Sequence, residues 1–222
     1  MCGRFVRCSP VTVIADEFNI RKSSLELAPS YNIAPNQDIL IINNEGKKQL
    51  ITCKWGFIPA WARDRSIGHK MINARAETLA SKPAFKDAFK KHRCLVIADG
   101  FYEWNKIENK KIPFYILLRT GRPFGIAGLY SYWTSSEKEK ICTCTIITTH
   151  ANELLEPLHD RMPAIIPKEK EDLWLDPDVT DTDILLDLLR PCPAEEIDMR
   201  QVSPKVNIPK YNSPEAIASV LN

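Results

Sequence analysis

The sequence predicts a single α+β domain over residues 1–222, with an antiparallel or mixed β core and helices at its periphery. The predicted strands gather in the middle of the chain and do not alternate regularly with helices, which disfavours parallel βαβ winding. The chain contains no internal repeat, low-complexity tract or Gly/Ser-rich linker, and 222 residues fit one domain. With 44 % hydrophobic and 26 % charged residues, it has the composition of an ordinary soluble globular protein.

The first predicted element is a short amphipathic helix that begins after Ser9 and Pro10, as an N-cap and a first helical residue. A β-hairpin follows, because two apolar runs at 38–42 and 49–55 flank turn-forming residues. Further apolar runs predict strands at 94–98, 101–104, 114–119, 124–128, 142–148 and 164–166. Additional helices are predicted at 84–91, 151–155, 168–175, 183–189 and 213–220.

The net charge of +2 conceals two segments of opposite sign. Between Lys54 and Arg93 there are ten Lys or Arg residues against three Asp or Glu, which gives a local charge of +7. Between Glu169 and Arg200 there are three against eleven, a local charge of −8. The basic segment suits a polyanionic partner, and the acidic one should face away from it. Solvated surface is the alternative interpretation of both charge runs.

The N-terminal region has no uninterrupted apolar run of the kind that a signal peptide needs. No stretch approaches the roughly 20 apolar residues of a membrane span. We therefore expect a protein of the cytosol, associated with the nucleoid, or of the nucleus. Seven irregularly spaced cysteines in such a chain argue against a disulfide framework. Cys142 and Cys144 share one face of a strand, and we expect them to pack in the core and to bind no metal.

Cys2 is the most reactive feature of the sequence. A small residue after Met1 favours removal of the initiator, which would leave Cys2 with a free α-amine beside its thiol. The amine has an ordinary pKa of about 7.7–8 and the thiol about 8.5, and positive charge from Arg4 and Arg7 would lower the latter. Such a pair condenses with an aldehyde to an imine and then closes a thiazolidine ring. Taken alone, the dipeptide is more typical of an ordinary residue near a clipped terminus, so the case for a reactive Cys2 depends on the rest of the chain.

Two other segments place reactive polar side chains in otherwise structural sequence. Asn73 can donate and accept hydrogen bonds, and Arg75 can fork onto a phosphate; the alternative is a capped helix start. Strand alternation places Glu103 on the same face as Phe101, among aromatic residues, where burial would make it a usable acid or base. The alternative for Glu103 is a sheet-edge carboxylate paired with Lys106.

His159 and the segment 55–63 complete the set of candidates. His159 is one of four histidines, and Pro163 makes the chain after it rigid; an ordinary surface histidine is the alternative. In 55–63, aromatic residues alternate with Gly, Pro and Arg in the basic part of the chain, as in a base-stacking platform for single-stranded nucleic acid. A Trp-lined core turn would show the same pattern.

Together and in this order, the motifs resemble the SRAP family, the SOS response-associated peptidases. The resemblance extends from Cys2 to about Pro209, and it is carried by MCGRF (1–5), YNIAP (31–35), WGFIP (55–59), NARAE (73–77), Arg93-Cys94 with DGFYEW (99–104), and HDRMP (159–163). It implies a compact domain whose β core resembles a barrel or two packed sheets. It also implies a protein that binds abasic sites in single-stranded DNA and links to them through its N-terminal cysteine.

The resemblance also assigns individual residues. By motif, the catalytic residues are Cys2, Asn73, Glu103 and His159, and the DNA-binding residues are Arg4, Trp61, Arg75 and Arg161. Cys2 is the nucleophile, exposed by removal of Met1, which is thought to be autocatalytic in this family. The resemblance implies no cofactor and no metal.

The chemistry expected of these residue types begins with opening of the abasic sugar to its C1′ aldehyde, for which His159 is the general acid. Glu103 takes a proton from the Cys2 ammonium or holds the neutral amine in line. The amine forms a Schiff base, and the thiolate then adds to the imine carbon to close the thiazolidine. Asn73 hydrogen-bonds the sugar oxygen or orients Cys2. The ring blocks β-elimination, so the reaction is a single turnover on DNA; without the thiol, the Schiff base would behave as a lyase intermediate.

Three other functions start from the same residues. The first is an N-terminal-nucleophile amidotransferase that hydrolyses glutamine, although the chain has no Asn-Gly-Glu segment to bind that substrate. The second is a non-covalent binder of single-stranded DNA. The third, a peptidase acting on other proteins, has no visible substrate machinery, so we restrict proteolysis to Met1. The expected partners are abasic single-stranded DNA and the replication machinery, with no membrane, and the protein is expected to be a monomer.

Overall fold

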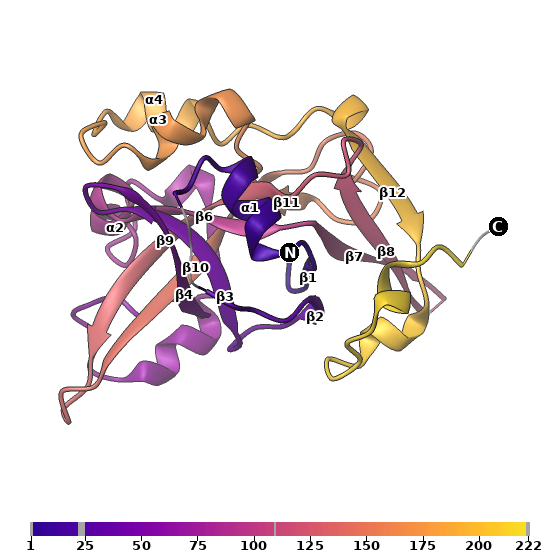
Figure 1. Ribbon diagram of the computed structural model, residues 1–222, viewed down its shortest axis with the longest axis horizontal. Helices are drawn as coiled ribbons and strands as arrows, with labels where there is room; N and C mark the ends of the chain where they lie inside the picture. Colours follow the sequence, from indigo (N-terminus) through magenta and orange to yellow (C-terminus); the bar gives the residue numbers. More distant parts are fainter. Residues whose placement is uncertain (1, 22–24, 109, 221–222) are drawn as a thin grey trace.

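Strands make up the core of the computed structural model, which describes residues 2–21, 25–108 and 110–220 (Figure 1). The strands are β1 (Phe5–Arg7), β2 (Ser30–Ile33), β3 (Asp38–Asn44), β4 (Lys48–Trp55), β5 (Asn73–Arg75), β6 (Arg93–Ala98), β7 (Gly100–Ile107), β8 (Lys110–Leu118), β9 (Phe124–Thr134), β10 (Lys140–His150), β11 (Arg161–Pro163) and β12 (Ile197–Gln201). The helices are α1 (Val11–Glu17), α2 (Lys86–Lys91), α3 (Glu171–Leu175) and α4 (Thr182–Asp187). Short 3₁₀ turns are η1 (Arg65–Lys70), η2 (Ala76–Thr78), η3 (Lys168–Lys170), η4 (Ala194–Glu196), η5 (Pro204–Asn207) and η6 (Pro214–Ile217).

Five of these strands close into a barrel. Their order is β10-β4-β3-β6-β9, and β9 pairs back onto β10. The β10–β4 pair is parallel and the other pairs are antiparallel, so the barrel is mixed. A second sheet has the order β12-β8-β7-β1-β2. The predicted fold class, a mainly antiparallel or mixed β core with peripheral helices, is confirmed.

Alternation along the strands sends side chains to two separate hydrophobic clusters. On β3, Leu40 and Ile42 join a cluster that includes Trp174 of α3 and residues of the other helices. Ile39 and Ile41 point the other way, into a cluster shared with the second sheet. Cys2 belongs to this second cluster, so the contact between barrel and sheet determines its surroundings.

The predicted hairpin is formed by β3 and β4, and the predicted helices at 84–91, 168–175 and 183–189 correspond to shorter ones. Two helix predictions were wrong. Residues 151–155 form turns between β10 and β11, and the C-terminal segment makes only the 3₁₀ turn η6. The strand predicted at 164–166 is instead β11, three residues earlier, and Ile165 makes a single bridge to Ile126.

The start of α1 also differs from the prediction. Its N-cap is Pro10, with no side-chain capping bond, and Ser9 does not cap it. The Ser9 backbone N–H and hydroxyl both donate to the carboxylate of Asp99 instead. This contact ties the end of β1 to the β6–β7 turn, so Ser9 serves the N-terminal strand.

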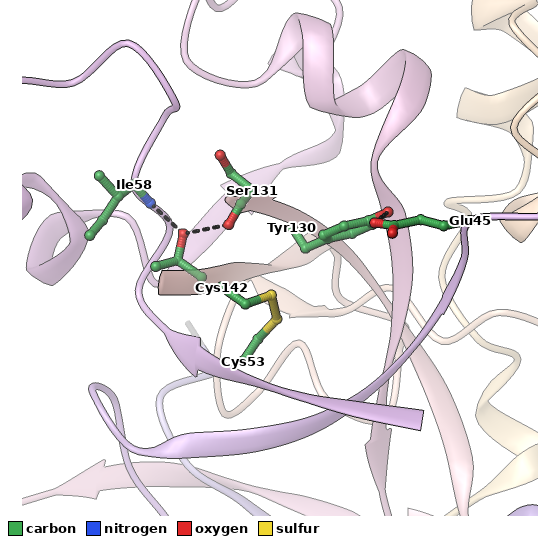
Figure 2. Close-up of a disulfide and its surroundings, with 7 residues drawn as sticks. Glu45, Cys53, Ile58, Tyr130, Ser131 and Cys142 are labelled. Atoms are coloured by element: carbon green, nitrogen blue, oxygen red, sulfur yellow. Dashed lines mark hydrogen bonds between the residues drawn. A yellow bond between two sulfur atoms is a disulfide. The ribbon is translucent and has the colours of Figure 1, made fainter. Parts of the chain in front are cut away.

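A disulfide corrects the expectation of reduced cysteines. Cys53 on β4 and Cys142 on β10 are bonded, with Cα atoms 4.8 Å apart (Figure 2). They are neighbours because β4 and β10 pair in parallel with Thr143 opposite Lys54. A separation of 89 residues hides this proximity from sequence reasoning. Cys144 is fully buried in the core, as predicted for that side chain.

Candidate active site

Cys2 lies just before β1 and is fully buried. Its strand is held from both sides, since Phe5 pairs with Ile33 of β2 and with Phe101 of β7. Beyond the strand, Asp99 accepts hydrogen bonds from the backbone N–H groups of Cys8 and Ser9 at 2.5 and 2.9 Å. These bonds fix the N-terminal segment, and with it the position of Cys2.

Asn73 lies at the start of β5 and reaches Cys2 directly. Its Nδ2 donates to the carbonyl oxygen of Cys2 at 2.8 Å. Asn73 is placed by two neighbours: β5 pairs in parallel with β10 opposite Ile146, and the indole N–H of Trp55 donates to the Ile72 carbonyl at 2.8 Å. Asn73 therefore lies on a short strand that anchors the N-terminal segment, and the 3₁₀ turn η2 that follows has no side-chain cap, so the alternative of a capped helix start is wrong.

Glu103 on β7 faces the same hydrophobic cluster as Cys2, since its neighbour two residues back, Phe101, is part of that cluster. The Glu103 side chain is buried, with 7 % of its surface exposed. Burial raises the pKa of its carboxyl above the usual range, and the positive charge of His159 opposes that rise. A buried carboxyl with a raised pKa can both release and accept a proton near neutral pH.

The thiol of Cys2 is not activated, because its surroundings favour the protonated form over the thiolate. Burial and, to a smaller extent, the nearby charge of Glu103 raise its pKa to about 12. The expected lowering by Arg4 and Arg7 does not occur. Arg4 donates to Asn32 Oδ1 at 2.8 Å and to the Val206 carbonyl at 3.0 Å, and Arg7 donates to backbone carbonyls of residues 27 and 28.

His159 lies in the turn before β11, with 31 % of its side chain exposed. Its Nδ1 accepts a hydrogen bond from the backbone N–H of Arg161 at 2.9 Å. A neutral imidazole that accepts at Nδ1 carries its proton at Nε2. The exposed carboxylate of Asp160 also lies 2.8 Å from Nδ1, where it can pair with the protonated ring.

Glu103 and His159 line the same cavity, which has a volume of about 530 Å³. Arg4 and Lys111 add two cationic side chains to its wall, and Trp104 and Asn207 add a ring and an amide. The Trp104 indole N–H donates to Asn207 Oδ1 at 2.7 Å, and the guanidinium of Arg4 lies 5.8 Å from the centre of the Trp104 ring. The volume lies within the range of small-molecule sites, and the cations favour an anionic ligand.

The four residues expected to bind DNA occupy different environments. Arg4 is half-buried in the cavity wall, Arg75 is exposed two residues after Asn73, and the Trp61 side chain is 62 % exposed. Arg161 is buried, and its guanidinium donates to both carboxylate oxygens of Glu77. The structure therefore places Glu103, His159 and Arg4 in one cavity wall, with Cys2 and Asn73 linked to Glu103 behind it. The cavity wall does not include Trp61, Arg75 or Arg161.

Sequence reasoning missed Lys111 and Asn207, and it used Trp104 only as part of a motif. Lys111 pairs across the β7–β8 hairpin with Lys106, so the hairpin register places it near Trp104. A hairpin prediction for 100–118 would have found it. Asn207 comes from η5, about a hundred residues later, and nothing in its local sequence marks it.

The described part of the chain offers neither a metal-ion cluster nor a membrane-spanning helix. No group of three or more His, Cys, Asp or Glu side chains there is arranged to hold a metal ion. No helix among the described residues is long and apolar enough to cross a membrane.

The fold and the site define a class: a mixed β-barrel protein with a cysteine next to its N-terminus, backed by an amide, a carboxyl and an imidazole at a cationic cavity. The chain belongs to the SOS response associated peptidase (SRAP) family, whose model matches residues 1–209. The resemblance seen in the sequence motifs is thus confirmed over nearly the whole chain.

Relatives and solved structures agree with this membership. The chain is 49 % identical to the abasic site processing protein YoqW of Bacillus subtilis, over 99 % of this chain and all of that one. It is 31 % identical to the abasic site processing protein HMCES of Xenopus tropicalis, over 87 % of this chain and 67 % of that one. A crystal structure of a Bacteroides thetaiotaomicron protein superposes with a TM-score of 0.90 at 29 % identity, covering 99 % of this chain and all of that one.

Proposed function

We propose that this protein captures abasic sites in single-stranded DNA by forming a thiazolidine between Cys2 and the ring-opened sugar. The observation that carries this proposal is the chain of contacts that joins four distant segments. Asn73 donates to Cys2, Glu103 lies close enough to Cys2 to raise the pKa of its thiol, and Glu103 lines one cationic cavity with His159. The names of the relatives, abasic site processing proteins, support the choice of substrate.

The raised pKa of the Cys2 thiol sets the order of the chemistry. Removal of Met1, a residue outside the described part of the chain, exposes the Cys2 amine. This amine attacks the C1′ aldehyde first, because the buried thiol is protonated. One water leaves as the imine forms. The S–H then adds across the C=N bond: sulfur bonds to carbon, and the proton ends on nitrogen, so no separate thiolate is needed.

Each neighbouring residue has one role in this sequence. Glu103 accepts a proton from the Cys2 ammonium and returns it to the carbinolamine oxygen that leaves as water. His159 donates from Nε2 to the sugar ring oxygen as the hemiacetal opens. Asn73 holds the Cys2 carbonyl at 2.8 Å, which keeps the amine aligned with the aldehyde.

Binding of the DNA strand needs protein contacts on both sides of the reacting sugar as well as at the sugar itself. Arg4 and Lys111 in the cavity wall suit the phosphates beside the abasic sugar, and the partly exposed Trp104 ring suits stacking of a neighbouring base. Arg75 and Trp61 lie in the basic 54–93 segment and extend this path outside the cavity. Binding of this kind is salt-dependent, because phosphate contacts release counterions.

Several finer expectations belong to the same proposal. The protein acts once per lesion, its peptidase activity is limited to autocatalytic removal of Met1, and it serves the response to DNA damage. It acts as a monomer in the cytosol at the nucleoid, or in a nucleus, where the replication machinery exposes single-stranded DNA.

Two substitutions of Cys2 test the proposal on a single-stranded oligonucleotide with one abasic site. Wild-type protein should form an adduct that survives heating, and Cys2→Ala should form no such adduct. Cys2→Ser keeps the amine but lacks sulfur, so it should form a link that persists only after reduction with borohydride. A heat-stable adduct with Cys2→Ala would contradict the mechanism. Binding without any adduct would identify a non-covalent binder, and ammonia released from glutamine would identify an amidotransferase.

A further inference from the structure

Glu77 and Arg161 lie behind the cavity and join the two segments that carry Asn73 and His159. Glu77 follows Asn73 by four residues in η2, and Arg161 follows His159 by two at the start of β11. The guanidinium donates from Nη1 to Oε1 of Glu77 at 2.6 Å and from Nη2 to Oε2 at 3.1 Å. A bidentate pair of this kind fixes the relative orientation of its two partners.

Burial and several hydrogen bonds hold the Arg161 side chain of this ion pair in one orientation. The Arg161 side chain is 7 % exposed, and Nη2 also donates to the Thr148 carbonyl. The Glu77 side chain is 41 % exposed, and His150 lies 3.3 Å from its Oε1. Burial opposes the charge on Glu77, but the hydrogen bonds and charge of Arg161, a backbone hydrogen bond and the charge of His150 together outweigh it, so the pKa of Glu77 is lowered. The guanidinium is thus already neutralised and enclosed, which is unlike a side chain waiting for a phosphate.

The backbone of Arg161 connects this pair to His159. Its N–H donates to Nδ1 of His159 at 2.9 Å, which leaves the proton of the neutral ring on Nε2. The charged groups that face the ring are Asp160, 2.8 Å from Nδ1, and Glu103, with which His159 shares the cavity. The conformation of the 159–161 turn therefore decides which nitrogen donates to a ligand.

We propose that Glu77 and Arg161 are positioning residues for the capture reaction: their ion pair holds the 159–161 turn so that His159 presents Nε2–H to the cavity. The same pair ties this turn to the segment of Asn73. This inference rests on the proposed function, because capture of an abasic site is its readout. It gives Arg161 a different role from the DNA contact that its family motif implies.

Glu77→Gln separates the two roles of Arg161. If the pair positions His159, the capture rate should fall about 10–100-fold, since misplacement of a catalytic group by about 1 Å costs on the order of 100-fold. Affinity for abasic single-stranded DNA should stay within about threefold of wild type. If Arg161 instead contacts DNA, releasing it from Glu77 should tighten binding, steepen the salt dependence and leave the rate unchanged. That second result would overturn the proposal.

The pH profile of the capture rate distinguishes positioning from general loss of structure. A changed His159 environment should move the profile of Glu77→Gln, whereas a purely structural defect lowers the rate by the same factor at every pH. Glu77→Asp keeps the charge and should recover part of the rate. Glu137→Gln, on the exposed β9–β10 turn, is the matched control and should behave as wild type.

A measurement on the unmodified protein covers the case in which Glu77→Gln fails to fold. Nitrogen-15 NMR of the histidine side chains should show His159, assigned with a His159→Gln variant, as the Nε2–H tautomer when neutral. The Nδ1–H tautomer would overturn the proposal. Failure of the proposed function is recognised separately: wild-type protein would then form no heat-stable adduct in the same assay.

Discussion

Glu103 and Glu77 are the same residue type in two environments of one site, and the environments give them opposite properties. Glu103 is buried at the cavity, and burial raises the pKa of its carboxyl. Glu77 is bound at both oxygens by Arg161, and its pKa is lowered despite some burial. A carboxyl with a raised pKa can exchange protons near neutral pH, whereas a carboxylate with a lowered pKa stays charged and keeps its hydrogen bonds to Arg161. The surroundings, more than the residue type, therefore separate a proton carrier from a positioning residue.

Glu103→Gln should have the largest effect, because it removes proton transfer and keeps the size of the side chain. The rate of adduct formation should fall by about 10²–10⁴-fold, the usual contribution of a general acid or base. Binding to the abasic oligonucleotide should change by less than about threefold. Single-turnover kinetics with saturating protein measures the rate, and fluorescence anisotropy measures the binding. Equal losses in both would make Glu103 a purely structural residue.

Glu77→Gln should destabilise the fold, because it leaves the Arg161 guanidinium without its counterion. A fully buried pair would cost 3–5 kcal/mol, but the Glu77 side chain is 41 % exposed, so we expect a loss of about 1–2 kcal/mol. Urea denaturation at neutral pH measures this difference. An unchanged midpoint would show that the pair contributes nothing to stability.

Glu103→Gln should stabilise the fold by about 1 kcal/mol at neutral pH, in contrast to Glu77→Gln. The raised pKa means that the native state holds the Glu103 proton more tightly than the unfolded chain. The free energy of unfolding therefore falls as the pH rises from the ordinary carboxyl range through the raised pKa. The advantage of the Gln variant should vanish in acid, where Glu103 is protonated in both states.

Glu77 should give the free energy of unfolding a pH dependence of the opposite sign. Its lowered pKa adds stability above the ordinary carboxyl pKa, and this stability is lost as the pH falls through the lowered value. Unfolding curves for Glu103→Gln and Glu77→Gln from acid to neutral pH test whether the two variants change stability in opposite directions. If both variants shift stability in the same direction at neutral pH, the contrast between the two glutamates is wrong.

Lys111→Ala should have the smallest effect, confined to binding. Lys111 lines the cavity, and in our proposal it contacts a phosphate. Removing one phosphate contact should reduce the slope of log affinity against log salt by about 0.7 for a single strand. The adduct rate at saturating protein should stay as in wild type. An unchanged slope would exclude Lys111 from the DNA path.

The sequence predicted the residues of the candidate site better than it predicted their environments. Motif order brought Cys2, Asn73, Glu103 and His159 into one hypothesis, and the structure places them together. The expected lowering of the Cys2 thiol pKa does not occur, because burial raises this pKa and because Arg4 and Arg7 donate to Asn32 and to backbone carbonyls. Directions of side chains and degrees of burial depend on tertiary contacts that a local pattern does not contain.

The helices and strands also divide into those that the sequence predicted well and those that it missed. Long apolar runs such as β3 and β4 were predicted well, because alternation over seven or eight residues is a strong signal. The three-residue strands β1, β5 and β11 were missed or misplaced, since three residues carry almost no periodicity. These short strands carry or flank Cys2, Asn73 and His159. The disulfide was missed because only the parallel pairing of β4 with β10 brings Cys53 to Cys142.

Intact-mass measurement of the protein with an abasic single-stranded oligonucleotide tests the central claim most directly. The mass of the free protein should be that of the chain without Met1. The mass of the adduct should be that of this protein plus the oligonucleotide minus one water. Digestion should place the link on Cys2, with both its amine and its thiol consumed. Protein that retains Met1 and forms no adduct, or an adduct linked through a lysine, would contradict this claim.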